Sequence, residues 1–538
     1  MADIKEIIAK VCPDAVFEEN EKPFAVVPDK DWHKVAEALK QSGYDWLNAV
    51  VGEDWGDELG CIYYLTAADG SEVSVKVATA DRENPMIHSV SDLWDCARLE
   101  EREVFDFFGI KFINHPDMRR LFLRNDWVGY PLRKDYDENP EINPVRLYHE
   151  QPDDVTVSYK EQADGTVKKE DVQIFSPEEF VVNIGPQHPA THGVLRFRTS
   201  LNGEEIKKID LVCGYIHRGI EKLSEKLTYP QCIHFFDRQD YFSALMNEHC
   251  FCMCVEKALG IEVPRRAQVI RVMMDELSRI ASHLLFFGTY CMDLGATTAL
   301  FYGIRERETI LDILEETCGA RMSFNYDVIG GVREDLHPDF VQRVKDFIAI
   351  MPSRLKEYHT LVTGNVIFQN RLKGVGMLSR EDAISYGVAG PSGRASGWAC
   401  DVRKLKPYSI YKELDFEEVV MDGCDSFSRY LVRMKEIEQS LKILEQLVDN
   451  IPDGEYCAKV PKIIKLPAGH WFQEVEACRG VFGVYIDSKG DKTPYRLKIN
   501  GTCLRLAGVV DHITRGTKIA DLITIGGSMD YVVPDIDR

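Results

Sequence analysis

The sequence predicts two domains of different fold class: an α+β domain over residues 1–136, and a mainly α domain with small β elements over residues 179–538. The 538 residues are too many for one compact core. Short strand and helix patterns alternate in the first part, whereas long patterns with apolar residues at i, i+3 and i+4 dominate the second. We interpret the polar, charged residues 137–178 between them as an exposed linker.

The elements of the first domain follow in order. WHKVAEALKQSG predicts an amphipathic helix that stops at Gly43. CIYYLTA and EVSVKVAT predict two strands around a turn at 69–70, and EREVFDFFG predicts a short helix that ends at Gly109. We also expect a small hairpin in the linker, with its turn at 164–165.

The second domain begins with the strand patterns EEFVVNIG and GVLRFRTSLNGEEIKKIDLVCG. DYFSALMNEHCFCMCVEKALG predicts a helix that ends at Gly260, and two longer helical patterns follow it. Further helices are expected near 338–360 and 425–450. We expect short strands and turns in the C-terminal ~70 residues, and hence a buried helical bundle with small β elements.

The chain is strongly acidic, with a formal charge of -22 and a pI of about 5.2. This charge argues against nucleic-acid binding and against attachment to anionic lipid. The first 20 residues lack the apolar segment of a signal peptide, and no apolar run reaches the ~18–20 residues of a membrane span. We therefore expect a cytosolic chain, or one that reaches a membrane only through partners.

The 15 cysteines do not form a disulfide framework or a metal-binding pattern. Their number is odd, the chain is large, and no C-x-x-C pair occurs, so we expect reduced thiols. Cys250, Cys252 and Cys254 are the one local cluster. Because they fall in a helical pattern at a spacing of two, we predict that they are small core residues.

The stretch GPQHPATHGVLRF places His188 and His192 four residues apart. On a helix both imidazoles would share one face, but Pro186, Pro189 and Gly193 make a helix improbable. A rigid loop that presents the histidines is therefore predicted. The alternative is that both histidines only satisfy backbone groups.

Several long stretches resemble a known family. EREVFDFFGIKFINHPDMRRLFLRNDWVGYPLRKDY closely resembles the signature of the 30-kDa-type subunit of respiratory complex I. GPQHPATHGVLRF, GYIHRGIEKL, DRQDY, ELSRIASHLLFFGT, RERETILDILEETCGARM and the ending KIADLITIGGSMDYVVPDIDR resemble its 49-kDa-type subunit. The chain thus resembles the fused C/D subunits of bacterial NADH-quinone oxidoreductases.

The same larger family includes the catalytic subunits of nickel-iron hydrogenases, so the resemblance implies that fold for the second domain. A nickel-iron centre needs two C-x-x-C pairs. Here Cys213 is followed three residues later by Ile216, and the ending SMDYVVPDIDR has no cysteine. We therefore expect the hydrogenase large-subunit fold without its metal site, and no metal held by this chain.

Reduction of a quinone needs two electrons and two protons, so its site wants two proton donors in a mostly apolar cleft. The resemblance implies that His192 and Tyr241 contact the quinone headgroup and that Asp293 partners the histidine. It places His188 and Thr289 at the quinone as well. The alternatives are that Tyr241 is a core residue and that Asp293 is a helix-end cap.

No G-x-G-x-x-G follows a strand, so we expect electrons from outside the chain. The resemblance implies a 4Fe-4S cluster in a neighbouring subunit, with Arg218 against it. The alternative for Arg218 is a surface salt bridge with Glu221 or Glu225. Ser323 replaces the histidine that the family usually has after GARM. This replacement suggests a low cluster potential, suited to a low-potential quinone such as menaquinone.

The resemblance implies a peripheral subunit on the cytoplasmic face of the bacterial inner membrane. Its partners would be iron-sulfur subunits of the peripheral arm and a membrane subunit that completes the quinone channel. Proton pumping would occur in separate membrane subunits. The charged segments of the first domain are expected to be half solvated and half docked on neighbouring subunits. Alternatives are a complex fed by ferredoxin, a hydrogenase-like enzyme, and a scaffold without chemistry.

Overall fold

The computed structural model describes residues 4–18, 22–137, 154–188 and 193–538. Its first domain is built on a sheet with strand order β1-β2-β5-β4-β3. The strands are β1 (Val16–Glu18), β2 (Phe24–Val26), β3 (Trp46–Asp54), β4 (Leu59–Thr66) and β5 (Glu72–Thr79). Helices α1 (Ile4–Val11), α2 (Asp29–Gln41) and α3 (Ala97–Phe108) accompany this sheet. α3 ends at Gly109 with φ 74°, a left-handed conformation that favours glycine, so this predicted helix end is confirmed.

The predicted hairpin is present, and it extends a sheet of the first domain. β8 (Val155–Glu161) and β9 (Val167–Gln173) pair antiparallel, and the Asp164 carboxylate accepts hydrogen bonds from the amide and hydroxyl of Thr166. These strands continue a sheet of order β6-β7-β8-β9, which starts with β6 (Met86–His88) and β7 (Lys111–Ile113). The described part of the predicted linker is therefore attached to the first domain.

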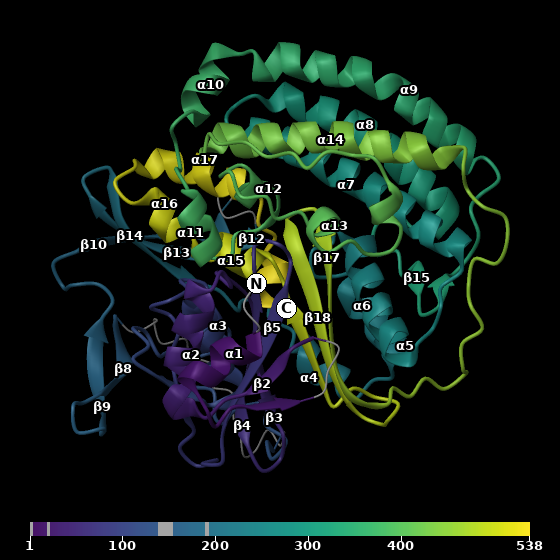
Figure 1. Ribbon diagram of the computed structural model, residues 1–538. Helices are drawn as coiled ribbons and strands as arrows, with labels where there is room; N and C mark the ends of the chain where they lie inside the picture. Colours follow the sequence, from purple (N-terminus) through teal and green to yellow (C-terminus); the bar gives the residue numbers. More distant parts are fainter. Residues whose placement is uncertain (1–3, 19–21, 138–153, 189–192) are drawn as a thin grey trace.

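A helical bundle dominates the second domain (Figure 1). Its long helices are α7 (Arg265–Asp293), α8 (Thr297–Cys318), α9 (Phe340–Tyr358) and α14 (Ser426–Val448). Most of α7 is buried, which makes it the central helix. The shorter helices include α4 (Ile220–Ser224), α5 (Tyr229–Phe236), α6 (Ala244–Leu259), α10 (Val366–Leu372), α11 (Arg380–Ser385), α12 (Gly390–Arg394) and α13 (Val402–Leu405). The helices predicted from periodicity are confirmed.

Small β elements surround the bundle. One sheet has the order β10-β13-β14, with β10 (Phe180–Ile184), β13 (Arg196–Asn202) and β14 (Glu205–Val212). Two short antiparallel pairs are β11 (Gln187–His188) with β12 (Gly193–Val194) and β15 (Asp327–Val328) with β16 (Gly331–Val332). A third sheet joins β17 (Ala468–Ala477), β18 (Gly480–Lys489) and β19 (Arg496–Asn500). In Figure 1 the long β17–β18 ribbon runs between the bundle and the first domain.

The end of the chain differs from the prediction of strands and turns. After β19 it forms α15 (Cys503–Gly508), α16 (Val510–Thr514), α17 (Ile519–Met529) and α18 (Val533–Asp537). LRLAG and ITIGGSM are apolar and almost completely buried. A helix of this kind shows no alternation of polar and apolar faces, so sequence periodicity does not reveal it.

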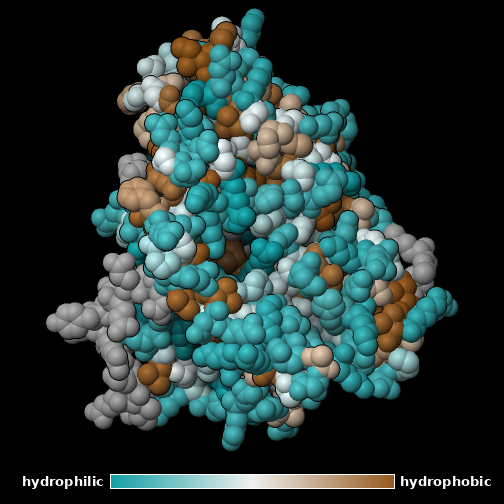
Figure 2. All heavy atoms as spheres, turned by 90° about the vertical axis from the view of Figure 1, so that its left-hand side faces the viewer, coloured by the Kyte–Doolittle hydropathy of each residue, from teal (hydrophilic) through white to brown (hydrophobic). Residues whose placement is uncertain are grey.

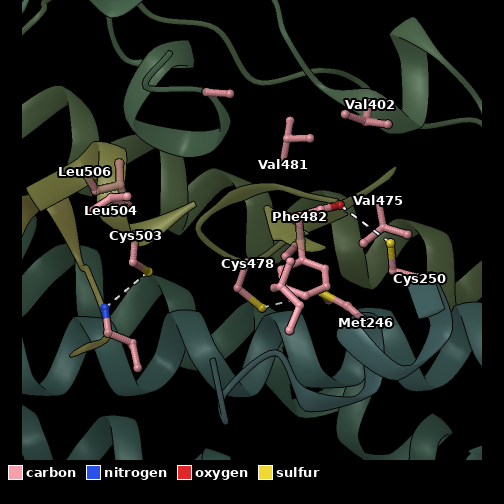
Figure 3. Packing of buried hydrophobic residues seen from close by; sticks show 14 of the residues in the cluster. Met246, Cys250, Val402, Val475, Cys478, Val481, Phe482, Cys503, Leu504 and Leu506 are labelled. Atoms are coloured by element: carbon pink, nitrogen blue, oxygen red, sulfur yellow. Dashed lines mark hydrogen bonds between the residues drawn. The ribbon is translucent and has the colours of Figure 1, made fainter. Parts of the chain in front are cut away.

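The cysteine cluster of α6 lies in the core, as predicted. Cys250, Cys252 and Cys254 are fully buried. The Cys250 thiol donates to the Phe482 carbonyl in β18 at 3.7 Å, and Cys478 contacts Met246 (Figure 3). These small side chains let the β17–β18 ribbon lie close on α6.

The charged helix α3 corrects one expectation. Its carboxylates are buried and do not face solvent, and two of them, Glu100 and Glu103, lie in the contact between the two domains. Glu100 accepts from the Arg505 Nε at 2.7 Å. Glu103 accepts from Arg538 at 2.7 Å and from Lys498. The two domains are therefore joined by ion pairs within the chain.

The outer surface is mostly hydrophilic on the face shown in Figure 2, with scattered hydrophobic residues. Within the part of the chain that the structure describes, no helix combines the length and apolarity of a membrane span.

Candidate functional site

Tyr241 lies in the tight turn that leads into α6. The helix starts at Ala244, so Tyr241 lies before it. The prediction that Tyr241 lies at the start of the helix is therefore wrong. The Asp240 carboxylate shapes the turn, because it accepts from the Phe242 amide at 3.2 Å and from the Ser243 hydroxyl at 2.7 Å. This Asx-type arrangement fixes the backbone on both sides of the tyrosine.

The Tyr241 side chain is half-buried and lies against the Phe242 ring, with ring centroids 4.2 Å apart and the ring planes tilted by 57°. Among the described residues its hydroxyl has no hydrogen-bond partner. Burial raises the pKa of Tyr241 above its ordinary value, and the nearby Arg479 charge opposes that increase. The hydroxyl therefore keeps its proton at neutral pH and can donate it to a ligand.

Thr289 and Asp293 lie in the last turn of α7. The Thr289 hydroxyl donates to the Leu285 carbonyl at 2.9 Å, so its hydrogen atom is used inside the helix. Asp293 is the last helical residue, and Leu294 is the C-cap, so the alternative that Asp293 caps the helix is wrong. A carboxylate at a helix C-terminus is opposed by the helix dipole. Helix stability therefore does not explain this half-buried acid.

The segment 527–533 lies close to three regions that contain predicted site residues: the end of α7, the β11–β12 pair and the turn before α6. A Cβ atom on Gly527 would lie only 2.9 Å from the Tyr290 ring of α7, so glycine permits this close approach, and the Asp293 carboxylate lies 3.6 Å from the same position. A Cβ atom on Gly193 would lie 2.6 Å from Val533. Asp530 is close enough to Tyr241 to act on its pKa. Thus one segment contacts the end of α7 and the β11–β12 pair, and lies near the turn before α6.

The structure describes one of the two histidines predicted for the loop. His192 lies outside the described residues. His188 belongs to β11, where its Cα pairs with Gly193 of β12. The described flanks of the loop are extended and not helical, in agreement with the prediction from the prolines and glycine.

Arg218 is exposed and makes no ion pair with any described residue. The expected alternative of a salt bridge with Glu221 or Glu225 is wrong, because both carboxylates have other partners. Glu221 accepts from Arg496 at 2.7 Å, and Glu225 pairs with Lys134 at 2.8 Å. The Arg218 guanidinium is thus left facing outward.

Ser323 begins a strained loop. It has φ 56° and Asn325 has φ 45°, values that residues other than glycine rarely adopt. The buried Glu248 carboxylate holds the loop by accepting from the amide of Asn325 at 2.8 Å. It also accepts from the next two backbone amides. Sequence reasoning did not find this buried acid.

Asp327, the first residue of β15 directly after this loop, is a second buried acid that the sequence did not reveal. Neither of its oxygens has a hydrogen-bond partner in the described structure. Arg271 stands 3.7 Å away but is committed to Glu256 at 2.7 Å. Burial therefore raises the pKa of Asp327 to about 7.

Cys213 lies in the core. Its thiol donates to the Leu121 carbonyl at 3.6 Å, and burial raises its pKa well above the ordinary value. The Ile216 amide, where a hydrogenase would have its second thiolate, donates to Asp537 at 2.9 Å. No group of three His, Cys, Asp or Glu side chains among the described residues could hold a metal ion.

A cleft of about 800 Å³ lies elsewhere, between the first domain and α6. It contains none of the predicted site residues. Several of its charged side chains pair with each other: Arg271 with Glu256, and Lys406 with Glu474. The cleft and the residues predicted from the sequence thus lie in different parts of the molecule.

Arg479, Asp530 and Tyr531 lie close to the predicted residues Tyr241 and Asp293 and were missed by sequence reasoning. Tyr531 is fully buried, and the Asp293 charge helps to raise its pKa. One signal was available: in SMDYVV an acid interrupts an apolar run, just as Asp293 does. The contacts of Arg479 join residues distant in sequence and have no local signature.

Comparison with protein families defines the class of the chain. Residues 25–141 match the family described as respiratory-chain NADH dehydrogenase, 30 Kd subunit. Residues 293–538 match the family described as respiratory-chain NADH dehydrogenase, 49 Kd subunit. The two matches follow in the order that the sequence motifs indicated.

Similar proteins carry both parts in one chain. The C/D subunit of the NADH-quinone oxidoreductase of Phocaeicola vulgatus is 56% identical over 515 residues, which is 95% of this chain and 99% of the relative. The corresponding C/D protein of Bacteroides thetaiotaomicron is 56% identical over 525 residues, with the same coverage. The separate D protein of the Bacillus cytotoxicus enzyme is 46% identical and covers 67% of this chain. The chain belongs to the family of fused C/D subunits of NADH-quinone oxidoreductases, and it is part of a respiratory-chain enzyme complex.

Proposed function

We propose that this chain forms the quinone-reduction site of its complex, with Tyr241 and His192 as proton donors and Asp293 as the partner of His192. One observation carries the proposal. The open Tyr241 hydroxyl lies near the segment 527–533, which also contacts the Asp293 end of α7 and the base of the loop that holds His192. His188 and Thr289 would line the same site.

The chemistry follows from the side chains. A quinone that takes two electrons must also take two protons at oxygens on opposite sides of its ring, so two separate donors are needed. Tyr241 holds one proton at neutral pH, since a tyrosine hydroxyl has an ordinary pKa of about 10 and burial raises the pKa of Tyr241 further. When it gives up that proton, the positive charge of Arg479 stabilises the phenolate.

Electrons would enter from a neighbouring iron-sulfur subunit. When that subunit is present, its 4Fe-4S cluster supplies them one at a time. Arg218, which is exposed and without an ion pair in the described structure, is available to face this cluster. A positive charge there favours the reduced, more negative cluster.

Ser323 cannot accept a proton when the cluster is reduced, so we infer a low cluster potential and a low-potential quinone such as menaquinone. A redox titration of the cluster in the assembled complex tests this inference. A low midpoint that changes little with pH is expected. A high and strongly pH-dependent midpoint would contradict it.

The placement of the chain follows from the same proposal. A membrane subunit would complete the quinone channel, so the chain would lie on the cytoplasmic face of the membrane beside other subunits of the complex. It would move no ions itself, and the energy of quinone reduction would drive pumping in the membrane subunits.

Quinone reductase activity with NADH as donor, measured in membranes, tests the proposal. We expect Tyr241→Phe to assemble but to lose about 10²-fold or more in turnover, because it removes a general acid. Tyr159→Phe changes a half-buried tyrosine on the distant β8 and should retain full activity. If Tyr241→Phe assembles and works as well as the wild type, Tyr241 is core packing and the scaffold alternative gains support.

A further inference from the structure

Arg479 occupies the junction between β17 and β18, and its side chain is buried. Its Nη1 donates to both oxygens of Asp240, at 3.0 Å each. Its Nε donates to the Asp530 carbonyl at 2.7 Å, and Nη2 donates to the Asp530 carboxylate at 3.2 Å. A further hydrogen bond reaches the Ser282 hydroxyl of α7 at 3.3 Å. One planar guanidinium thus holds three separate elements.

The same group contacts both sequence neighbours of Tyr241. It pairs with Asp240 on one side and lies over the Phe242 ring on the other, 5.3 Å from the ring centroid. The Phe242 ring in turn lies 4.2 Å from the Tyr241 ring. Arg479 does not hydrogen-bond the Tyr241 hydroxyl, so it can act on that group through position and charge.

The Asp530 contact extends this arrangement to the rest of the site. Asp530 has φ 59° and ends α17, where the chain turns toward Val533. Because Arg479 binds both its carbonyl and its carboxylate, it fixes this turn. The turn then sets where Val533 supports Gly193, next to the loop that carries His192.

We propose that Arg479 is the positioning residue of the quinone site, which holds Tyr241 in register with the end of α7 and with the β11–β12 strand pair. The inference rests on the function proposed above. The competing explanation is that the buried cluster of two carboxylates and one arginine affects only the stability of the fold. The test must therefore distinguish an effect through Tyr241 from a general loss of stability.

A double-mutant cycle in the intact complex makes this distinction. The variants are Tyr241→Phe, Arg479→Gln and their combination, with kcat and KM measured for the quinone. NADH oxidation by ferricyanide in the same preparations reports electron input without the quinone site. We expect Arg479→Gln to lower kcat about 10²-fold, because a misplacement of about 1 Å has an effect of this size. The KM should change less, and ferricyanide reduction should stay within about twofold of wild type.

The combination decides the question. If Arg479 acts through Tyr241, the double variant should be no more than about threefold slower than Tyr241→Phe alone, because the same group is lost twice. If the two losses multiply, Arg479 has only a structural role and the inference fails, while the proposed function stands. If Tyr241→Phe alone has no effect, both fail.

Arg479→Lys covers the case in which Arg479→Gln does not assemble. Lysine keeps the charge but cannot bridge both carboxylates, so we expect a loss of about 10-fold that again does not multiply with Tyr241→Phe. Arg403→Lys is the matched control. Arg403 is also buried between two carboxylates, Asp401 and Glu276, but it does not contact the Tyr241 turn. The loss of kcat caused by Arg403→Lys should therefore multiply with the loss caused by Tyr241→Phe.

Discussion

The contact between the two domains and the candidate quinone site contain the same kinds of charged side chains. They differ in whether a polar group is left without a hydrogen-bond partner. At the domain contact, Glu100 and Glu103 of α3 each meet cations of the second domain. At the site, Asp240 and Asp530 also meet an arginine, but the hydroxyl of the nearby Tyr241 has no partner among the described residues. Paired charges hold the two domains together, whereas an open donor leaves a place for a ligand.

Glu103→Ala should have the largest effect on stability, because it removes the carboxylate that pairs with the buried Lys498 and Arg538 and leaves Lys498 only the longer 3.7 Å pair with Glu221. Breaking a buried pair of this kind costs about 3–5 kcal/mol. Chemical denaturation of the purified chain measures it. Asp449→Ala, which removes an exposed pair with Lys345, should cost less than about 1 kcal/mol. Similar losses in both variants would show that the domain contact is not held by its ion pairs.

Asp327→Asn tests the opposite case, a buried acid without a hydrogen-bond partner in the described structure. Its pKa of about 7 lies above the ordinary 3.8, so the folded chain keeps a proton that the unfolded chain releases between these values. The free energy of unfolding of the wild type should fall as pH rises from about 4 to 7 and change little above. The variant lacks this term, so its advantage should grow to at most about 4 kcal/mol above pH 7. If the difference in free energy of unfolding between Asp327→Asn and the wild type were the same at pH 5 and pH 8, the raised pKa of Asp327 would be refuted.

Arg218→Gln should have the smallest effect on the fold, within about 0.5 kcal/mol, because its guanidinium is exposed and makes no ion pair in the described part of the chain. In the assembled complex the midpoint of the neighbouring cluster should become more negative, since a positive charge is lost. A redox titration of wild type and variant measures the change. An unchanged midpoint would place Arg218 away from the cluster.

The sequence predicted what local patterns encode. Long helices such as α7, the strands β4 and β5, and the ends at Gly109 and Gly260 follow from periodicity and from single glycines. The helices after β19 were missed because buried helices have no polar face. The site residue Tyr241 came from resemblance, whereas Arg479 and Asp327 depend on contacts between distant segments and on burial.

The continuous chain across the domain contact has a consequence for assembly. The D protein of Bacillus cytotoxicus is covered over 99% of its length but matches only 67% of this chain, so it has no counterpart for the remainder. Two separate proteins would meet at a rate set by their abundance. Here the halves are tethered, with an effective concentration on the order of millimolar. The contact can therefore tolerate weaker pairing than an interface between two separate proteins could, and the two halves are always made in equal numbers.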